Sequence, residues 1–377
     1  MDASGLTRVR LCGTPPPRVE WALDLEVSVP TGWARQAGSA CRDGQLDLGA
    51  VDTTSAAAIA QDLRLRAAFI DASPQSARLP FRYHHVPAAL RTFIAGRIGR
   101  RLRDRQHEWA RFPGWPLDVS ADVFDDLAAA HTPIDRTPTP VVVSHDIDSA
   151  EGLRLLVDRF LEIEERAGAR STNYIVPCGW PLDHGLLREI VARGHTIGVH
   201  GFDHSNKTPH ASPADRRDRL RRGFDALAAY GPRGYRAPSL IRTAGLLDDL
   251  AELYDYDSSI PTSGGPFPAF NNGCASVRPF VIGRTLELPV TMRRDGSLLF
   301  MGHRPDEIGE MWRHDAAAVH RARGVVMVLT HCERRFTGNE PMLDTYRQFL
   351  EHLASTDTFE WSTPETVIAA RVATSVA

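Results

Sequence analysis

The sequence has few cysteines, one lysine and no long apolar run among its 377 residues. The cysteines are odd in number and never form a CxxC pair, so their spacing supports neither a disulfide framework nor a thiolate zinc site. They are Cys12, Cys41, Cys178, Cys274 and Cys332. Any metal site in this chain must therefore use histidine and carboxylate ligands.

An excess of positive charge is also missing, because 44 Lys and Arg residues against 47 Asp and Glu residues give a formal net charge of -3. A chain without a global positive field is a poor partner for nucleic acid. No window approaches the roughly 18 apolar residues of a membrane-spanning helix, and the N-terminal residues show no apolar stretch of signal-peptide length. We therefore expect a cytoplasmic, globular protein without an integral membrane segment.

A proline- and threonine-rich segment, HTPIDRTPTP at residues 131–140, divides the sequence. The apolar run that follows it is typical of a buried strand after a linker. We predict an N-terminal accessory region of α+β type, residues 1–137, and a main domain, residues 138–377. The role of the accessory region is open, with a cap over the active site as one hypothesis. Its patterns predict a strand over residues 19–29 and helices over residues 54–65 and 87–105.

Short β-rich runs alternate with helical patterns through the main domain. The runs cover residues 141–148, 171–177, 195–201, 234–240, 254–260, 285–291 and 325–332. The helical patterns cover residues 150–166, 185–193, 213–230, 244–253 and 342–353. This alternation implies parallel strands with crossover helices, and its seven or eight units favour a (β/α) barrel over an open sheet.

Polar side chains stand where several of the predicted strands end. They are Asp146, Asp148, His200, His204, Arg236, Asp257 and His331. Catalytic side chains of (β/α) barrels occupy such positions. A buried strand has no structural use for a carboxylate or an imidazole at its end unless another group pairs with it. The pattern therefore indicates one functional site.

Two pairs among these residues have the spacing of metal ligands. His200 and His204 are four residues apart and converge on one cation if the chain after the strand turns helically. Asp146 and Asp148 are two residues apart, so in an extended strand both carboxylates face one cavity. Because two acids on one face repel each other, we expect one to bind the metal with the histidines and the other to accept a proton from metal-bound water.

Two histidines and one carboxylate with open coordination positions are typical of a hydrolytic zinc site and equally of a non-haem iron site. Each residue also has a structural alternative. Asp148 is placed to cap the following helix, Arg236 can be a surface cation and His331 a buried, hydrogen-bonded histidine. In the functional interpretation Arg236 clamps a carboxylate of the cavity and His331 is a general acid opposite the metal.

The ordered motifs SHDID, HGFDHS, YRAPS, YDSS and LTHCE resemble those of the NodB-type polysaccharide deacetylase family over about residues 139–370. The resemblance implies an α/β fold, a distorted (β/α) barrel of about seven strands. It also implies a divalent metal that hydrolyses N-acetyl groups on amino sugars. Zinc is the expected cofactor, with cobalt, nickel and iron as alternatives.

The resemblance assigns roles to the residues of the first two motifs. It makes Asp146 the general base and Asp148 a metal ligand. His200 and His204 match the two histidine ligands. The sequence departs from the family pattern at Ser205, where a proline is frequent.

The resemblance also assigns roles to the later motifs. Arg236 lies beside the base, and the backbone amide of Ser239 holds the oxyanion, although a tyrosine is common at this position. Asp257 orients His331, the general acid of the last motif. The tryptophan that often accompanies the fourth motif is missing, and Trp180 is a candidate substrate contact elsewhere.

The expected partner of this site is a small molecule or glycan with an N-acyl group. The alternatives are an amidase or deformylase-type hydrolase of a small non-sugar amide, an iron-dependent oxygenase on the same ligands, and an inactive binding module. Four aromatic residues are either sugar-stacking platforms or interdomain core. They are Trp109, Phe112, Trp115 and Trp180.

Residues 87–105 predict an amphipathic helix with five apolar side chains among six arginines. The apolar residues are Leu90, Phe93, Ile94, Ile98 and Leu102, and the arginines are Arg91, Arg97, Arg100, Arg101, Arg103 and Arg105. Such a helix can make a peripheral contact with an anionic membrane. Docking on the barrel is the favoured alternative, because Gly96 and Gly99 weaken an isolated helix.

Overall fold

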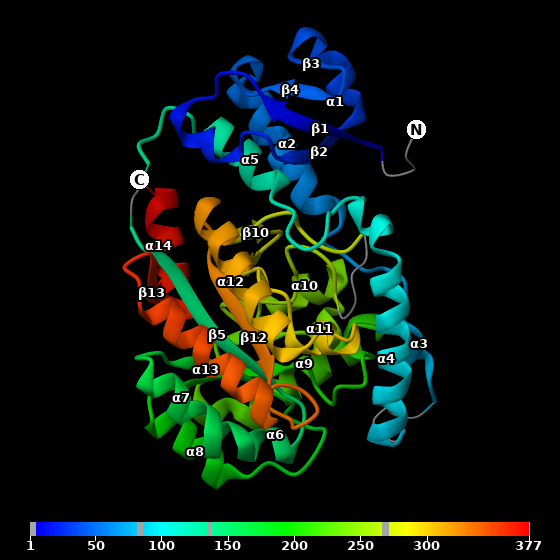
Figure 1. The fold of residues 1–377 in the computed structure, drawn as a ribbon. Coiled ribbons are helices and arrows are strands. Elements are labelled where there is room, and N and C mark those ends of the chain that lie inside the picture. Colours follow the sequence, from blue (N-terminus) through cyan, green and yellow to red (C-terminus); the bar gives the residue numbers. More distant parts are fainter. Residues whose placement is uncertain (1–4, 81–85, 135–136, 266–270, 377) are drawn as a thin grey trace.

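The computed structural model describes residues 5–80, 86–134, 137–265 and 271–376. A four-stranded sheet with helices forms the N-terminal part at the top of Figure 1, and a nine-stranded sheet surrounded by helices forms the larger part below it. The strands are β1 (Leu6–Cys12), β2 (Glu26–Pro30), β3 (Cys41–Arg42), β4 (Gln45–Asp47), β5 (Thr139–Ile147), β6 (Ser171–Ile175), β7 (Thr196–His200), β8 (Gly234–Arg236), β9 (Tyr256–Asp257), β10 (Phe280–Ile282), β11 (Thr285–Glu287), β12 (Val326–His331) and β13 (Phe359–Trp361).

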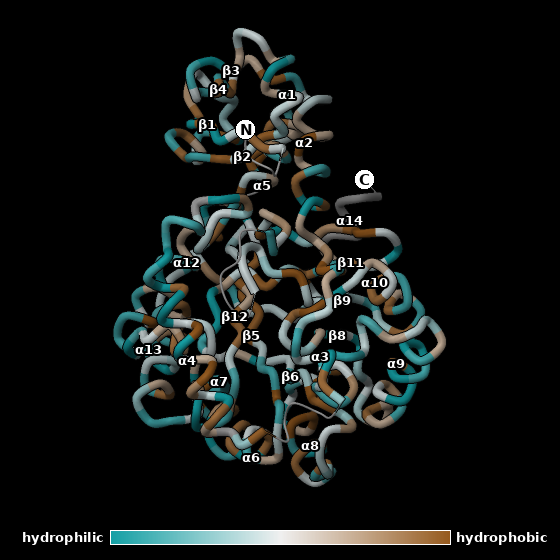
Figure 2. Tube along the Cα trace, turned by 90° about the vertical axis from the view of Figure 1, so that its right-hand side faces the viewer, coloured by the Kyte–Doolittle hydropathy of each residue, from teal (hydrophilic) through white to brown (hydrophobic). Residues whose placement is uncertain are grey.

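The α-helices of the accessory region are α1 (Thr31–Gln36), α2 (Thr53–Arg66), α3 (Gln75–Arg78), α4 (Ala88–Asp104) and α5 (Ser120–Ala128). Those of the main part are α6 (Ala150–Leu155), α7 (Leu161–Arg166), α8 (His184–Ala192), α9 (Pro213–Leu227), α10 (Ala244–Leu250), α11 (Asp295–Phe300), α12 (Pro305–Arg321), α13 (Glu340–Ala354) and α14 (Pro364–Val376). Figure 2 shows that outer helices such as α9 carry mostly hydrophilic residues.

The larger sheet is mainly parallel. Its hydrogen-bonded order is β10-β11-β9-β8-β7-β6-β5-β12, with β13 paired to the start of β5. Within the described residues, the seven neighbouring strands from β11 to β12 run parallel, and β10 is antiparallel to β11. This arrangement confirms the predicted α/β class with a parallel sheet.

The barrel itself is not confirmed by the strand pairing. In the described residues the ladder ends at β10 on one side and at β12 on the other. A side chain crosses part of the gap, because the Thr291 hydroxyl donates to the Val325 carbonyl at 2.8 Å and accepts from the Met327 N–H at 2.8 Å. The Thr291 side chain thus makes two of the hydrogen bonds that a neighbouring strand would otherwise make with residues 325–327.

The strand and helix alternation of the main part is as predicted. Each predicted run contains a strand, and the ends of that strand lie inside the run or within two residues of it. These strands are β5, β6, β7, β8, β9, β11 and β12. The helix predicted over residues 150–166 is one helical run in which a π-helical segment, Leu156–Phe160, joins α6 to α7. The sequence patterns predict no helix at α11 and α12, which lie between β11 and β12, or at α14 after β13.

The accessory region is of α+β type, with a sheet in the order β2-β1-β4-β3 and a close packing of α2 against α5. The strand predicted over residues 19–29 is only partly correct. Pro17–Ala22 forms a 3₁₀ helix, and Asp24 adopts φ 68 before β2 begins. Proline starts a helical turn easily and cannot donate to a ladder, which explains the difference.

Most of the hydrophobic core lies in two large clusters. One is built from the main part and includes Ala68 and Trp109 of the accessory region, whereas the other lies in the accessory region and includes Ala275. Trp109 and Phe112 are 8% and 7% exposed in these clusters, which supports the interdomain-core interpretation for both. The proposed boundary near residue 137 lies between α5 and β5.

Helix α4 lies along the side of the main part in Figure 1. Gly99 lets it approach α11, because a Cβ atom there would lie 2.3 Å from the Phe300 carbonyl oxygen. The predicted docking is thus correct, but four predicted apolar residues do not take part in it. Leu90, Phe93, Ile94 and Ile98 are 46% to 57% exposed. Among the described helices, none is long and apolar enough to cross a bilayer.

Candidate metal and catalytic site

The strand register brings the predicted polar residues to one edge of the sheet. Asp146, near the end of β5, pairs with His331 of β12. His200, the last residue of β7, pairs with Arg236, the last residue of β8. Because parallel strands all end at the same edge, residues that are far apart in the sequence become neighbours there.

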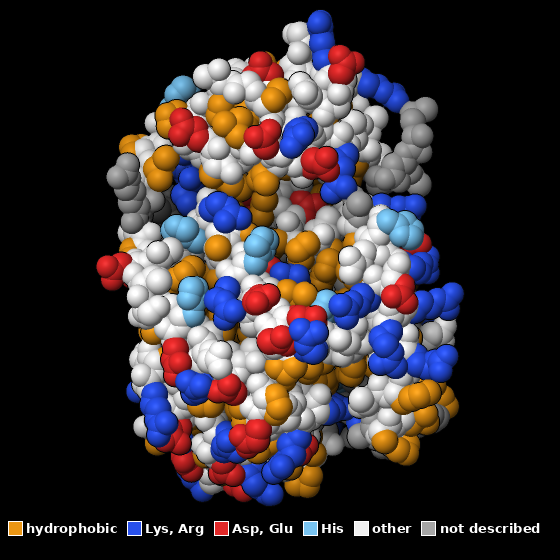
Figure 3. Space-filling view, in the orientation of Figure 1, with side chains coloured by type: hydrophobic (Ala, Val, Ile, Leu, Met, Phe, Trp, Pro, Cys, Tyr) orange, Lys and Arg blue, Asp and Glu red, His pale blue; other side chains and the backbone are white. Residues whose placement is uncertain are grey.

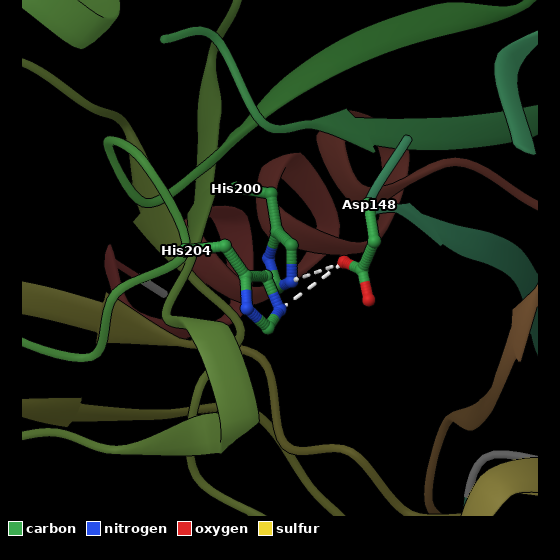
Figure 4. A group of neighbouring side chains, drawn as sticks. All are labelled: Asp148, His200 and His204. Carbon is green, nitrogen blue, oxygen red and sulfur yellow. Dashed lines mark ion pairs between the residues drawn. The ribbon is translucent and has the colours of Figure 1, made fainter. Parts of the chain in front are cut away.

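Asp148, His200 and His204 form a three-ligand set (Figure 4). The Asp148 Oδ1 atom lies 3.1 Å from His204 Nε2 and 3.5 Å from His200 Nε2. Four ligands at zinc bond lengths lie roughly 3.3 Å from one another. Asp148 Oδ1 is buried and accepts no hydrogen bond within the described chain. A buried carboxylate oxygen facing two imidazole nitrogens fits a divalent cation.

Each histidine is held in place by its surroundings. The Nδ1 atom of His200 lies 3.0 Å from the Arg236 carbonyl oxygen, so Nδ1–H donates there and Nε2 is left for a metal. Burial lowers the pKa of His200 to about 4, so the imidazole is neutral near pH 7. His204 reaches the cation position through bends of the chain and φ 55, and the predicted helical turn is absent from this described loop.

The helix-cap alternative for Asp148 is wrong. Ser149 is the N-cap residue of α6, and its hydroxyl accepts from the Gly152 N–H at 3.2 Å. Burial opposes ionisation of Asp148, but the neighbouring histidines, His204 first, bring its pKa well below the usual range. Asp148 is therefore an anion that faces the ligand position.

Asp146 is the free acid of the pair, and Arg236 holds it. Arg236 Nη1 donates to Asp146 Oδ1 at 3.0 Å, and the guanidinium lies 4.0 Å from the centre of the Tyr174 ring. Arg236 is fully buried, which excludes the surface-cation alternative. Burial raises the pKa of Asp146, but nearby positive charge, Arg236 included, outweighs it and leaves the pKa below the usual value. Asp146 is therefore ionised and able to accept a proton.

His331 is oriented by Asp295, and the prediction that Asp257 orients it is wrong. The His331 Nδ1–H donates to Asp295 Oδ1 at 2.8 Å, and the His331 N–H donates to Asp295 Oδ2 at 2.8 Å. Burial lowers the pKa of His331, but Asp295 and the carboxylates of the site raise it to about 9. The imidazole is thus protonated near neutral pH, as a general acid must be.

Asp257 belongs to a different buried group. Its Oδ1 atom accepts from the Ser259 hydroxyl at 2.6 Å, and Glu287 stands opposite it in the β9–β11 ladder. Burial and the Asp257 charge raise the pKa of Glu287 well above its usual value. The raised pKa favours a protonated Glu287 in the core, and neither acid has a hydrogen bond to His331 in the described residues.

Two further residues of the site were missed in the sequence. Asp295 opens α11, a helix that was not predicted. Glu333, two residues after His331, is 3% exposed, and its Oε1 atom accepts from the Asp148 N–H at 3.1 Å and the Ser149 hydroxyl at 2.8 Å. Glu333 thus fixes the backbone that carries Asp148, a candidate metal ligand. The motif LTHCE could have indicated Glu333, because it places this acid two residues after the predicted catalytic histidine.

Ser239 lies just beyond β8, near the loop that carries His204. Its φ is 53, and Asn206 Nδ2 donates to its hydroxyl at 3.4 Å. His204, Asn206 and Ser239 all have positive φ, a conformation that non-glycine residues adopt mainly where the surrounding structure enforces it. Ser205, in place of the expected proline, donates to Asp203 instead of joining the site.

Trp180 lies in the loop after β6 and packs partly buried against the large core cluster. The same loop contacts the histidine loop, because the Cys178 N–H donates to the Phe202 carbonyl at 2.9 Å. The indole Nε1 of Trp180 is buried without a hydrogen-bond partner in the described residues. Its role as a substrate contact stays a prediction.

The accessory region reaches the histidine loop through α3. Asn206 Nδ2 donates to the Ser76 hydroxyl at 3.0 Å. Ser73, Ala77, Phe202 and Lys207 line the same surface cleft. Residues of the accessory region therefore stand next to the loop that carries His204.

Comparisons with known proteins place the fold. No family model and no curated protein matches the sequence. A solved structure described as a polysaccharide deacetylase from Mycobacterium smegmatis is 20% identical, covers 65% of this chain and 93% of its own, and superposes with a TM-score of 0.51. A Puue allantoinase is 13% identical, covers 69% and 98%, and has a TM-score of 0.52. About two thirds of the chain therefore has the NodB-type deacetylase fold that the motifs predicted.

Proposed function

We propose that the protein is a metal-dependent hydrolase that removes an N-acetyl or other N-acyl group from an amino sugar or an amino-sugar-containing metabolite or glycan. One observation carries the proposal. A three-ligand set lies beside an ionised acid, Asp146, which is paired in the sheet with a protonated histidine, His331. Amide hydrolysis needs a base for the attacking water and an acid for the departing amine.

The residues divide this work among themselves. Asp148, His200 and His204 would hold the metal, whose chemistry when bound is to polarise the acyl carbonyl and acidify a water molecule. Asp146 accepts the proton of the attacking water, and Arg236 keeps this carboxylate in place. The C–N bond breaks as His331 gives its proton to the nitrogen, so the products are a carboxylic acid and a free amine.

The remaining roles are proposals of the same kind. The Ser239 backbone amide would donate to the oxyanion. Zinc is the proposed metal, with cobalt, nickel and iron as alternatives, because histidine and carboxylate ligands suit all four. Metal analysis after aerobic and anaerobic purification separates the hydrolase from an iron-dependent oxygenase. Zinc with release of acetate supports the hydrolase, and iron with consumption of oxygen supports the oxygenase.

The proposed activity is tested by incubating the purified protein with N-acylated sugars and sugar nucleotides and following loss of the acyl mass by mass spectrometry. We expect an N-acetylated amino sugar to lose its acetyl group and to yield one acetate for each free amine. An Asp146→Asn sample processed in parallel controls for contaminating activity. The proposal is wrong if every sugar stays intact.

A hydrolase of a small non-sugar amide is the second candidate. It is favoured by the similarity to an allantoinase, which superposes as well as the polysaccharide deacetylase does. Cyclic amides therefore belong in the same substrate panel. Turnover of a cyclic amide without turnover of any sugar selects this candidate.

We further propose that the accessory region caps the active site and that its domain boundary lies near residue 137. The contact between Ser76 and Asn206 supports the cap, because it joins α3 to the loop that holds His204. A cap of this kind limits the size of substrate that reaches the metal.

Peripheral membrane contact through α4 is a separate prediction. Its exposed apolar residues and its arginines suit the interface of an anionic bilayer. We expect the protein to float with phosphatidylglycerol vesicles and not with neutral phosphatidylcholine vesicles. Phe93→Ser combined with Ile94→Ser should reduce flotation, whereas Val281→Ser, at an exposed residue of β10, should not. Equal flotation of the double variant and the unchanged protein would contradict the prediction.

A further inference from the structure

A buried arginine without an ion-pair partner lies beside the proposed catalytic residues. Arg294 is 8% exposed, and its guanidinium makes one hydrogen bond, from Nη2 to the Ser297 hydroxyl at 3.2 Å. Within the described chain, no carboxylate oxygen lies within 4.0 Å of it. Burial of an unpaired charge is costly and is retained mainly where a ligand completes the pair.

Other arginines of the core do not share this property. Arg236 is paired with Asp146, and the adjacent Arg293 binds Asp315 through both Nε and Nη2 at 2.7 Å. Arg242 has no carboxylate but donates to three backbone carbonyl oxygens at 2.7 to 3.1 Å. Arg294 therefore stands out because its donors are not satisfied by the protein.

The Arg294 side chain lines a narrow pocket. Trp115, Ser263 and Thr291 line it as well, and Ser297 completes its polar side. The volume of the pocket is about 10 Å³, which is the room that roughly one water molecule needs. The pocket can therefore admit one oxygen atom of a bound group but not a sugar ring.

The chain connects this pocket to the catalytic centre. Arg294 directly precedes Asp295, which binds His331 through two hydrogen bonds. Asp146 and Asp295 are close enough to act on the charge of Arg294, although burial is stronger and lowers its pKa to about 10. The guanidinium is still fully charged at neutral pH. Because consecutive Cα atoms lie about 3.8 Å apart, the backbone of Arg294 lies next to the residue that orients His331.

We propose that the Arg294 pocket binds an anionic oxygen group, a carboxylate or a phosphate, on the acylated substrate. This inference rests on the proposed function and narrows its substrate class to acidic amino-sugar derivatives. A guanidinium suits either group, because its N–H donors form charge-assisted hydrogen bonds with the anionic oxygen that enters the pocket. Ser263 also lines the pocket, and its hydroxyl, which accepts from the Asp118 N–H at 2.8 Å, still has a proton to donate.

Anion binding can be tested without any turnover. The purified full-length protein is titrated with sodium acetate and with inorganic phosphate at constant ionic strength, and the unfolding temperature is followed. We expect one of the two anions to raise it, which also identifies the group. Arg294→Met should weaken the apparent affinity by about 10- to 100-fold, the loss expected for charge-assisted hydrogen bonds. No response to either anion would overturn the inference.

Two variants control for folding. Arg334→Met removes an exposed arginine and should leave the anion response unchanged. Without anion, Arg294→Met should not lower the unfolding temperature, because it removes a buried unpaired charge. A lowered unfolding temperature together with a retained anion response would show that Arg294 has a structural role, and the inference would be wrong. Arg294→Lys keeps the charge and should retain part of the response.

Substrate preference supplies the second test. N-Acetylglucosamine is compared with N-acetylmuramic acid, which adds a carboxylate, and with N-acetylglucosamine 6-phosphate. We expect the kcat/KM of one acidic substrate to exceed that of the neutral sugar, and Arg294→Met to reduce this ratio by about 10-fold or more. Equal kcat/KM values for all three substrates would overturn this inference but not the proposed deacetylase activity. Anion binding without release of an acyl group would contradict only the proposed function.

Discussion

Asp146→Asn is expected to lower turnover by about 10²- to 10⁴-fold while the bound metal remains, because it removes the proton acceptor and leaves all three proposed ligands. Asparagine keeps the shape of the side chain and can still accept from Arg236. Metal content is measured by elemental analysis of the purified protein and turnover by acetate release. Asp255→Asn, at an exposed acid paired with Arg233, is the matched control and should change neither quantity.

His200→Ala is the partner experiment and should lose both metal and turnover. Removing one of three protein ligands opens the site, and it also leaves Asp148 as a buried anion without one of its neighbours. A bound metal that is unaffected by His200→Ala would refute the ligand assignment. Comparing the metal content of the two variants shows which residue is the base and which is a ligand. The spacing of DxD and HxxxH alone does not distinguish these roles.

Asp295→Asn is expected to move the alkaline limb of the pH profile of kcat/KM to lower pH. His331 must be protonated to act as the acid, so activity falls as the pH rises through its pKa, which is about 9 in the folded protein. Burial alone would lower this pKa, and Asp295 is the main group that raises it. Removing the charge should therefore shift the limb downward by about 1 to 3 pH units.

Asp257→Asn provides the comparison for this profile. Asp257 is hydrogen-bonded to Ser259 and has no hydrogen bond to His331 in the described chain, so the alkaline limb should stay in place. If the alkaline limb shifted with Asp257→Asn and stayed in place with Asp295→Asn, Asp257 would be the residue that orients His331, as the resemblance implied. Thermal unfolding of both variants shows whether a loss of activity reflects a loss of structure.

The strand ends could be predicted from the sequence because their pattern is local. Buried parallel strands appear as continuous apolar runs, and a polar residue at the end of such a run is conspicuous. This signal located Asp146, His200, Arg236 and His331, which the strand register brings to one edge. The helices around them were also predicted, except α11 and α12 between β11 and β12 and α14 after β13.

For helix α4 the sequence predicted the helix but not the face that docks. Its pattern indicated an amphipathic helix, and the structure contains one. Which face docks could not be known, because Gly99 makes the close contact to Phe300 and the longer apolar side chains remain exposed. The usual expectation that large apolar residues cover the core failed here because a backbone approach needs a small residue.

The sequence by itself determined which chemistry the chain can support, since the order and spacing of two acids and two histidines follow from covalent connectivity and the period of a strand. The tertiary structure alone decided which acid holds His331, because Asp295 and His331 come from elements that meet only in space. It also decided that Arg294 is enclosed without a counter-charge. Burial and pairing depend on the packing of distant segments, and for that reason they are properties of the fold and not of any local pattern.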